Sequence, residues 1–166
     1  MSIDLVTTWL NNFQMDVHTP SQRSYNMSRI KGKNTKPEKV IRQLLWGCGY
    51  RYQLHSKDLP GKPDIMFSRK KKVIFIHGCF WHKHNCKYFK WPTSNTNFWK
   101  NKINENVQRD RKHLQALKNS GWSYFILWEC ETKQKDLSPL LDRLMLFLGS
   151  PKTVERIKSP FSSSRP

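Results

Sequence analysis

The stretch Val73-Ile-Phe-Ile-His-Gly-Cys-Phe-Trp-His82 decides the fold. Its first half, Val73 to His77, is a short continuous apolar run that ends in an imidazole, and such a run is typical of a strand buried inside a sheet. After Gly78 the chain is irregular and rich in His, Cys and aromatic residues as far as residue 97. The sequence therefore predicts a buried strand that delivers His77 at its end, followed by a loop that carries metal-binding and aromatic side chains.

The segments on both sides of this strand alternate between helical and extended patterns. Pro37 is well placed to open a helix that ends at Gly47 and Gly49, and Gly121 is expected to cap a long helix. The predicted helices cover residues 20–30, 37–47, 98–119 and 137–148, and the predicted strands cover 50–55, 64–67, 73–77 and 122–128. This order predicts an α/β fold in which helices flank a mixed central sheet.

Length and charge restrict the domain organisation and the partner. A chain of 166 residues suits one domain, predicted at residues 20–148 between a flexible extension at 1–19 and a mobile, basic Ser/Pro-rich tail at 149–166. Thirty Lys and Arg against twelve Asp and Glu give a formal net charge of +18, which favours a nucleic acid as the partner. A basic soluble protein without a specific partner is the alternative from charge alone.

Four cysteines, two of them surrounded by histidines, indicate a metal site. No apolar run has the length of a membrane span and no secretory signal is recognised, so we expect a cytoplasmic protein with reduced thiols. If the strands at 73–77 and 122–128 are neighbours, their ends bring Cys130 beside the cluster that follows Gly78. A closed tetrahedral zinc site would then be formed by Cys79, His84, Cys86 and Cys130. His82 is an alternative to His84, and Cys48 is expected to be a core thiol.

Asp110 interrupts the apolar stripe of the predicted long helix. A buried carboxylate is costly unless a charge, a metal or a network of donors compensates it. An ion pair with Arg109 or Arg111 would explain the position structurally, and a place in an active site would explain it functionally.

Two further carboxylates are less informative alone. Asp64 follows Pro63 at the start of a strand, where Asp is disfavoured, although an ordinary turn residue is the simpler explanation. Glu38 lies in a first helical turn, where it complements the helix dipole. Because Asp64 precedes one strand and His77 ends the next, both are expected to face one cleft suited to metal-dependent phosphodiester cleavage.

Several blocks together resemble the very short patch repair (Vsr) endonucleases. The blocks are Leu59-Pro-Gly-Lys-Pro-Asp64, Val73 to His82, Cys86, Asn106-Val-Gln-Arg-Asp110 and Trp128-Glu-Cys130, and the resemblance runs from about residue 16 to 149. It implies the restriction-endonuclease-like fold related to the PD-(D/E)xK nucleases. The second acid and the lysine of that motif are missing here, because Phe75-Ile-His77 stands in their place. Acid–base work must therefore come from other residues.

The resemblance also implies the metal ligands. Asp64 would be the principal magnesium ligand, the residue before His77 would add its backbone carbonyl, and Glu38 would hold metal-bound water. That residue is Ile76 here, where the family often has Thr, and a carbonyl ligand tolerates the change. Two magnesium ions would stabilise the attacking and leaving oxygens. The implied zinc ligands are again Cys79, His84, Cys86 and Cys130.

Two histidines and one aspartate receive roles in catalysis by the same resemblance. His77 would assist at the scissile phosphate. His82, oriented by Asp110, would activate or position the attacking water, and this pairing would explain the acid in the apolar stripe.

The family nicks DNA 5′ to the thymine of a T:G mismatch that arises when 5-methylcytosine deaminates. A wobble pair is easier to unstack than a good pair, so an aromatic wedge can discriminate it. By resemblance the wedge is Phe80, Trp81 and Trp99, with core packing as the alternative. Further DNA contacts are expected from Arg23, Arg29 and Asn106, and the turn at residues 69–72 either grips phosphate or is solvated.

Two alternatives remain open at this stage. A zinc-containing DNA-binding module without activity would explain the charge, the aromatic residues and the cysteines. A related nuclease acting on another lesion or on unmodified DNA would explain the carboxylates as well. The expected setting is a monomer on double-stranded DNA near the nucleoid, linked to a cytosine-5 methyltransferase and to a repair polymerase and ligase.

Overall fold

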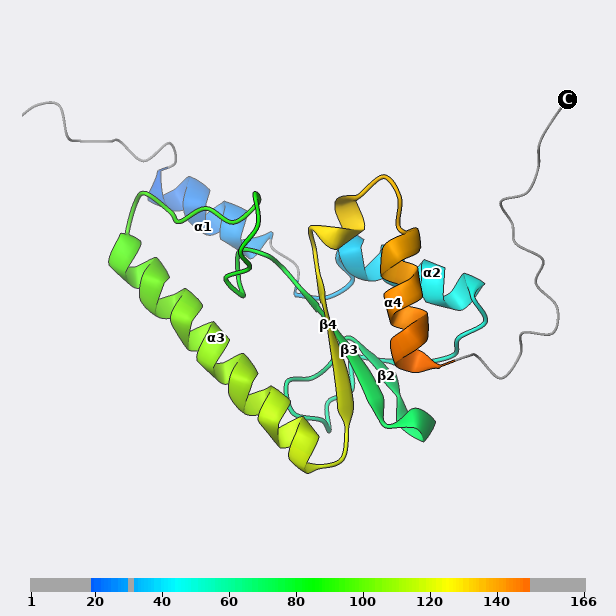
Figure 1. Ribbon diagram of the computed structural model, residues 1–166. Coiled ribbons are helices and arrows are strands. Elements are labelled where there is room, and N and C mark those ends of the chain that lie inside the picture. The colour runs from blue at the N-terminus through cyan, green and yellow to red at the C-terminus, as the bar shows by residue number, and fades with distance from the viewer. Residues whose placement is uncertain (1–18, 30–31, 150–166) are drawn as a thin grey trace, which may run out of the picture. The chain divides into compact units, whose positions relative to one another are not determined.

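A four-stranded mixed sheet organises the larger part of the chain (Figure 1). The computed structural model describes residues 19–29 and 32–149, and the chain divides into two compact units between Lys33 and Asn34. The strands are β1 (Gln53–Leu54), β2 (Ile65–Phe67), β3 (Lys72–His77) and β4 (Ser123–Trp128), in that spatial order. β2 pairs antiparallel with β1 and β3, whereas β3 and β4 are parallel. The predicted mixed sheet is confirmed.

Helices cover both faces of this sheet (Figure 1). α2 (Lys36–Gly47) and α4 (Ser138–Leu148) lie on one face, and α3 (Thr96–Asn119) lies on the other. Ile74 is buried with residues of α2 and α4, while Val73 and Phe75 are buried with Leu117 of α3. Because successive side chains of a strand point to opposite faces, two covered faces explain why β3 is a continuous apolar run.

The smaller unit contains α1 (Pro20–Ser28). Thr19 caps this helix in a reciprocal pair with Gln22, and the Arg29 guanidinium donates to the Tyr25 hydroxyl at 2.8 Å. A helix is therefore confirmed where residues 20–30 predicted one. The predicted DNA contact of Arg23 concerns a side chain outside the described residues.

The predicted strand at residues 50–55 is wrong in length, because only Gln53 and Leu54 pair with β2. The flanking tyrosines are used for packing instead. Tyr50 and Tyr52 both meet the ring of Phe67 edge-on at 6.0 Å, and the Tyr50 hydroxyl donates to the Gly149 carbonyl at 2.8 Å. Side-chain packing onto the core therefore replaces backbone pairing in this segment.

Two lysines of the basic turn predicted at residues 69–72 have a different use from the two expected. Ser68–Lys70 form a single 3-10 turn, Lys71 has a left-handed backbone with φ 47°, and Lys72 already belongs to β3. Lys70 Nζ donates to the Leu148 carbonyl at 2.9 Å, and Lys72 Nζ donates to the Phe147 carbonyl at 2.6 Å. Both ammonium groups thus cap the carbonyl end of α4, where the helix dipole favours a cation.

The remaining predictions on the fold concern the chain ends. The predicted flexible extension and mobile tail fall, apart from Thr19 and Gly149, outside the described residues. Among the helices of the described part, none combines the length and the apolar character that crossing a membrane requires.

Candidate active site and metal centre

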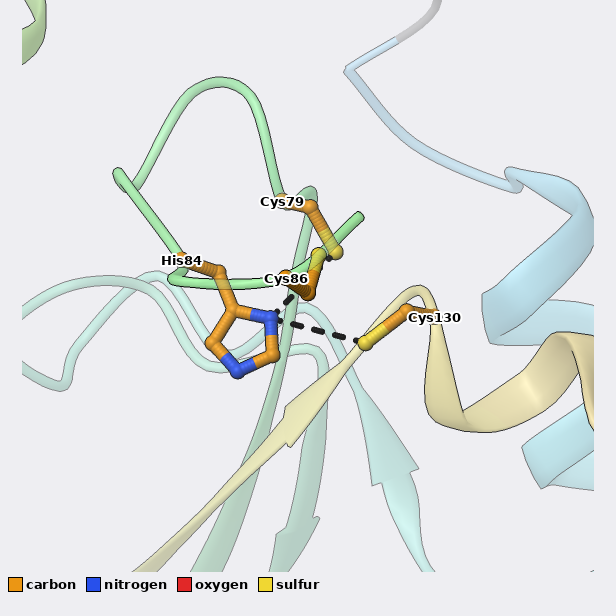
Figure 2. A group of neighbouring side chains, drawn as sticks. All are labelled: Cys79, His84, Cys86 and Cys130. Atoms are coloured by element: carbon orange, nitrogen blue, oxygen red, sulfur yellow. Dashed lines mark hydrogen bonds between the residues drawn. The ribbon is translucent and has the colours of Figure 1, made fainter. Parts of the chain in front are cut away.

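A cluster of three thiols and one imidazole lies where β3 and β4 end (Figure 2). Cys79 follows β3 by two residues and Cys130 follows β4 by two, and the parallel pairing of His77 with Trp128 brings the two segments together. His84 Nδ1 lies 3.6 Å from Cys79 Sγ and 3.4 Å from Cys130 Sγ. With Cys86, the four ligand atoms lie within 4.8 Å of one another.

The spacing of this cluster fits a tetrahedral metal. Zinc–sulfur bonds of about 2.3 Å and zinc–nitrogen bonds of about 2.0–2.1 Å at a tetrahedral angle place sulfur and nitrogen about 3.6 Å apart. Both sulfur–nitrogen distances agree with that value. The His84 ring is also stacked on Trp128 with 4.1 Å between the centroids, which fixes its orientation. His84 therefore completes the cluster, and the alternative ligand His82 is engaged elsewhere.

His82 is paired with Asp110. Nδ1 of His82, in the loop after β3, lies 2.5 Å from Oδ2 of Asp110 on α3. Burial would raise the pKa of the Asp110 carboxyl, but the hydrogen bond and charge of His82 outweigh it and lower that pKa. The Arg109 guanidinium instead donates to Asn106 at 2.9 Å. The acid in the apolar stripe of α3 is thus explained by an imidazole partner.

The His77 ring packs against the pair formed by His82 and Asp110. It is stacked on the ring of His82, with 3.7 Å between the centroids and 7° between the planes. Burial, together with the neighbouring His82, lowers the pKa of His77 to about 3. His77 is therefore a neutral imidazole at physiological pH, able to donate one N–H and to accept with the other nitrogen.

Asp64 immediately precedes β2 and lies beside the backbone of Ile76 on the neighbouring strand β3. Its Oδ2 accepts a hydrogen bond from the Ile76 N–H at 2.7 Å. Burial raises the pKa of Asp64 to about 6 against the pull of that hydrogen bond, and the negative charge of Glu38 adds to the rise. A bound cation would stabilise the charged form of such a half-buried carboxyl group, so Asp64 is a candidate metal ligand.

The match to known proteins points to one family. A family model described as DNA mismatch endonuclease Vsr matches residues 15–88. The chain is 45% identical over 126 residues to "Type II nicking enzyme V.XorIIP" of Xanthomonas oryzae pv. oryzae, covering 76% of this chain and 91% of that protein. It is also 42% identical over 121 residues to "DNA mismatch endonuclease Vsr" of Escherichia coli, covering 73% and 78%.

The chain belongs to the Vsr family. It is therefore an endonuclease, as the sequence blocks from Leu59 to Cys130 predict. A third member of the family with a similar match is "Type II nicking enzyme V.NmeAIP" of Neisseria meningitidis serogroup A, at 46% identity over 120 residues, which covers 72% of this chain and 86% of that protein.

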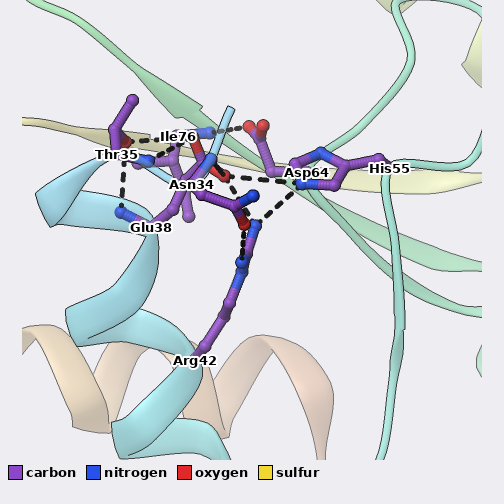
Figure 3. Close-up of polar contacts among 7 residues, drawn as sticks. All are labelled: Asn34, Thr35, Glu38, Arg42, His55, Asp64 and Ile76. Atoms are coloured by element: carbon purple, nitrogen blue, oxygen red, sulfur yellow. Dashed lines mark hydrogen bonds and ion pairs between the residues drawn. The ribbon is translucent and has the colours of Figure 1, made fainter. Parts of the chain in front are cut away.

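Glu38 of this Vsr protein has a structural task that the helix-dipole interpretation describes only in part. It is buried at 3% exposure and closes the capping box of α2 with Thr35. Its carboxylate also accepts from the Asn34 N–H at 3.0 Å and from the Arg42 guanidinium at 2.6 Å. Glu38, His55 and Asp64 offer ligand atoms within 4.8 Å of one another (Figure 3).

His55 and Arg42 are the residues of this Vsr site that sequence reasoning missed. His55 follows β1 directly, and the antiparallel register Leu54 to Ile65 places it opposite Asp64, whose carbonyl accepts from the His55 N–H at 3.1 Å. Pairing the two predicted strands in a hairpin would have found it. Arg42 lies four residues after Glu38, a spacing that brings side chains together on a helix.

The three predicted wedge residues form one aromatic group. Ring centroids are 5.1 Å apart for Phe80 and Trp81, 5.4 Å for Phe80 and Trp99, and 6.0 Å for Trp81 and Trp99. All three are partly buried, and none belongs to the two core clusters found among the described residues. Asn106, predicted to contact DNA, is buried, and its Nδ2 donates to the Trp81 carbonyl at 3.2 Å. In this Vsr protein Asn106 therefore holds the loop that carries the aromatic group.

Proposed function

We propose that this Vsr-family endonuclease nicks one strand of duplex DNA 5′ to the thymine of a T:G mismatch that arises by deamination of 5-methylcytosine. We also propose that the reaction depends on magnesium at Asp64, with two ions, and that the Cys79, His84, Cys86 and Cys130 cluster holds one structural zinc. Two observations carry the proposal. The Asp64 carboxylate is hydrogen-bonded to the backbone of Ile76, the residue before His77. The His77 ring is stacked on His82, which pairs with Asp110.

The residues around Asp64 fit a magnesium ion by their chemistry. Magnesium prefers carboxylate and carbonyl oxygens. The Ile76 N–H is directed at Asp64, and because both polar groups of a strand residue point to the same side, the Ile76 carbonyl is directed to that side as well. When bound, magnesium would neutralise charge on the scissile phosphate and ease deprotonation of water. Asp64 and Ile76 are the residues that would hold it.

His82 is the candidate general base. Asp110 occupies the Nδ1 side of its ring, which favours the tautomer with the proton on Nδ1. Nε2 then has a free lone pair that accepts a proton from the attacking water, and Asp110 stabilises the imidazolium that results. The neutral His77, stacked against it, is suited to donate its N–H to a phosphate oxygen.

The aromatic group supports recognition of a mismatch. Phe80 and Trp81 lie in the loop between the cluster residues Cys79 and His84, and Trp99 is in the first turn of α3. A closed four-ligand zinc site would brace that loop and do no chemistry. Rings held in this way can enter a weakly stacked T:G step at lower cost than a paired step. The formal charge of +18 favours the phosphate backbone as partner.

The test uses three labelled duplexes that differ at one base pair: T:G, U:G and T:A. With magnesium we expect a single nick 5′ to the thymine of the T:G duplex, and Asp64→Ala is expected to abolish it while leaving binding in place. Equal cutting of the T:A duplex would contradict mismatch specificity. Nicking by a pure Asp64→Ala protein would contradict the metal role of Asp64.

The biological setting is part of the same proposal. We expect a monomer that acts near the nucleoid in the cytoplasm, at sites made by a cytosine-5 methyltransferase, and that leaves its nick to a polymerase and a ligase. The +18 charge supports the location on DNA. Arg29 of α1, and Arg23 with it, are expected to lie along the DNA. Loss of affinity with rising salt would support these phosphate contacts.

A further inference from the structure

Glu38 has no acceptor position left for another donor. A carboxylate offers about four lone-pair positions. Oε1 accepts from the Thr35 N–H at 3.3 Å and the Thr35 hydroxyl at 2.9 Å, and Oε2 accepts from the Asn34 N–H at 3.0 Å and Arg42 Nη2 at 2.6 Å. The water-holding role implied for Glu38 by family resemblance therefore competes with the donors already present.

Arg42 is the one of these donors that carries a charge. Its side chain is only 13% exposed, and besides Glu38 it contacts Asn34 Oδ1 at 2.6 Å through Nη1 and His55 Nε2 at 2.9 Å through Nη2. The Arg42 Nε is buried without a hydrogen-bond partner among the described residues. Burying a cation with an unsatisfied donor costs stability, so packing alone does not account for it.

His55 links this guanidinium to the metal-binding carboxylate. An arginine can only donate, so His55 Nε2 accepts from Arg42 and the proton of the neutral ring is on Nδ1. The backbone of His55, with φ 50°, donates to the Asp64 carbonyl at 3.1 Å. A continuous path of contacts therefore runs from Glu38 through Arg42 and His55 to the residue that would bind magnesium (Figure 3).

We propose that Arg42 is a fixed cation of the magnesium site and, with His55, a positioning residue for Asp64. This inference rests on the proposed function, because it assumes that a divalent cation binds at Asp64. The guanidinium holds the carboxylates of Glu38 and Asp64 in one cluster when no metal is present. It also repels the incoming cation and occupies Glu38 Oε2, so it weakens metal binding while it keeps the site in shape.

The two effects have opposite signs, and this separates the proposal from a purely structural role. Arg42→Met removes the repulsion, so metal affinity is expected to rise about tenfold. The same change frees the segment that carries Asp64, so turnover at saturating metal is expected to fall about tenfold. A residue that only supported the fold would lower both quantities or neither.

Binding of Mn²⁺, used as a substitute for magnesium, is measured on the full-length protein. The method is either titration calorimetry or electron paramagnetic resonance of the free Mn²⁺. Nicking rates at saturating Mg²⁺ are measured in parallel. Arg143→Met is the matched control, because it removes an exposed arginine of α4 that pairs with Glu131. α4 lies outside the proposed magnesium site. Its metal affinity and its nicking rate are expected to equal those of the parent.

Two further variants keep the proposal testable if Arg42→Met does not fold. Arg42→Lys keeps the positive charge but loses the guanidinium, which contacts Asn34 through one nitrogen and Glu38 and His55 through the other. We therefore expect parental Mn²⁺ affinity with reduced turnover. His55→Gln can still accept from Arg42 and is expected to retain turnover, whereas His55→Leu is expected to lose it. Unchanged turnover in Arg42→Lys and in His55→Leu would overturn the positioning role.

The outcomes for the inference and for the proposed function differ. If parental Mn²⁺ binding does not depend on Asp64, tested with Asp64→Asn, the proposed metal site fails. If binding depends on Asp64 but Arg42→Met binds Mn²⁺ no more tightly than Arg143→Met, the proposed function stands and the fixed-cation inference is overturned.

Discussion

The two candidate metal sites near the end of β3 differ in every respect that decides what a metal does. The cluster of Cys79, His84, Cys86 and Cys130 has three sulfur atoms and one nitrogen, and its four side chains leave no position open. The site of Asp64 has oxygen donors, one of them in a raised-pKa carboxyl, and it adjoins the pair of stacked imidazoles. A closed set of soft donors is suited to holding structure, whereas an open set of hard donors is suited to activating water. The two sites near the end of β3 would thus have different tasks, one structural and one catalytic.

The largest expected effect tests the bracing side. Cys130→Ser is expected to lose the bound zinc and about 5 kcal/mol of stability or more, since metal-binding free energy is also folding free energy at such a site. Metal content by plasma mass spectrometry and thermal unfolding measure the two losses. Asp64→Ala is the control and is expected to keep its zinc. A Cys130→Ser protein with full zinc content would contradict the ligand set.

A large effect on the chemical side is expected from Asp110. Asp110→Asn keeps the size of the side chain but can no longer stabilise the charged His82 ring. Losing the help of a general base lowers rates by about 10²- to 10⁴-fold, so nicking is expected to fall within this range while zinc content and DNA affinity stay unchanged. Single-turnover nicking of a T:G duplex measures it. A rate within a factor of about two of the parent would contradict the proposed role of the Asp110 carboxylate.

A smaller effect concerns stability without metal. Burial raises the pKa of Asp64 from the ordinary value of 3.8 in the unfolded chain to about 6 in the folded protein. Between these values the folded protein holds a proton that the unfolded chain has lost, so stability falls as the pH rises, by at most about 3 kcal/mol above pH 6. Asp64→Asn lacks this ionisation and can still accept from the Ile76 N–H. Thermal unfolding in a chelator is expected to show it more stable than the parent above about pH 6 and equal near about pH 4.

The smallest expected effect concerns the aromatic loop that Asn106 holds. Asn106→Ala removes the hydrogen bond to the Trp81 carbonyl and leaves Arg109 without its amide partner. We expect a loss of about 1 kcal/mol of stability and a weaker preference for T:G over T:A duplexes, because the aromatic loop is held less firmly. Competition binding with the two duplexes measures the preference. An unchanged preference together with weaker binding to both would instead favour the direct DNA contact expected from the sequence.

The difference between the sites also explains what the sequence could predict. Three of the four cluster ligands lie within eight residues, from Cys79 to Cys86, so local spacing predicts a cluster there. The choice of His84 over His82 and the approach of Cys130 depend on the tertiary fold. The continuous apolar run of β3 predicted burial on both faces, which the two helix layers confirm. Features that depend on residues close together in the sequence can therefore be predicted from it.

Contacts between distant segments were not accessible in this way. His55 meets Asp64 through hairpin register, and Arg42 meets His55 only once α2 lies against that hairpin. The sequence predicts phosphate or solvent as the partner of Lys70 and Lys72, because nothing in their neighbours indicates the carbonyl end of α4 about 75 residues later. A long side chain can reach several partners, and the tertiary fold alone chooses among them.

If Asp64 binds the metal as proposed, its hydrogen bond from the Ile76 N–H makes cutting conditional on correct folding. A slip of β3 by one residue against β2 would turn Val73 and Phe75 toward the helices that Ile74 now faces, and would move the Ile76 amide away from the carboxylate. Misaligned chains would therefore carry no assembled cutting centre. For a DNA endonuclease, such dependence on strand register would confine cutting to correctly folded protein.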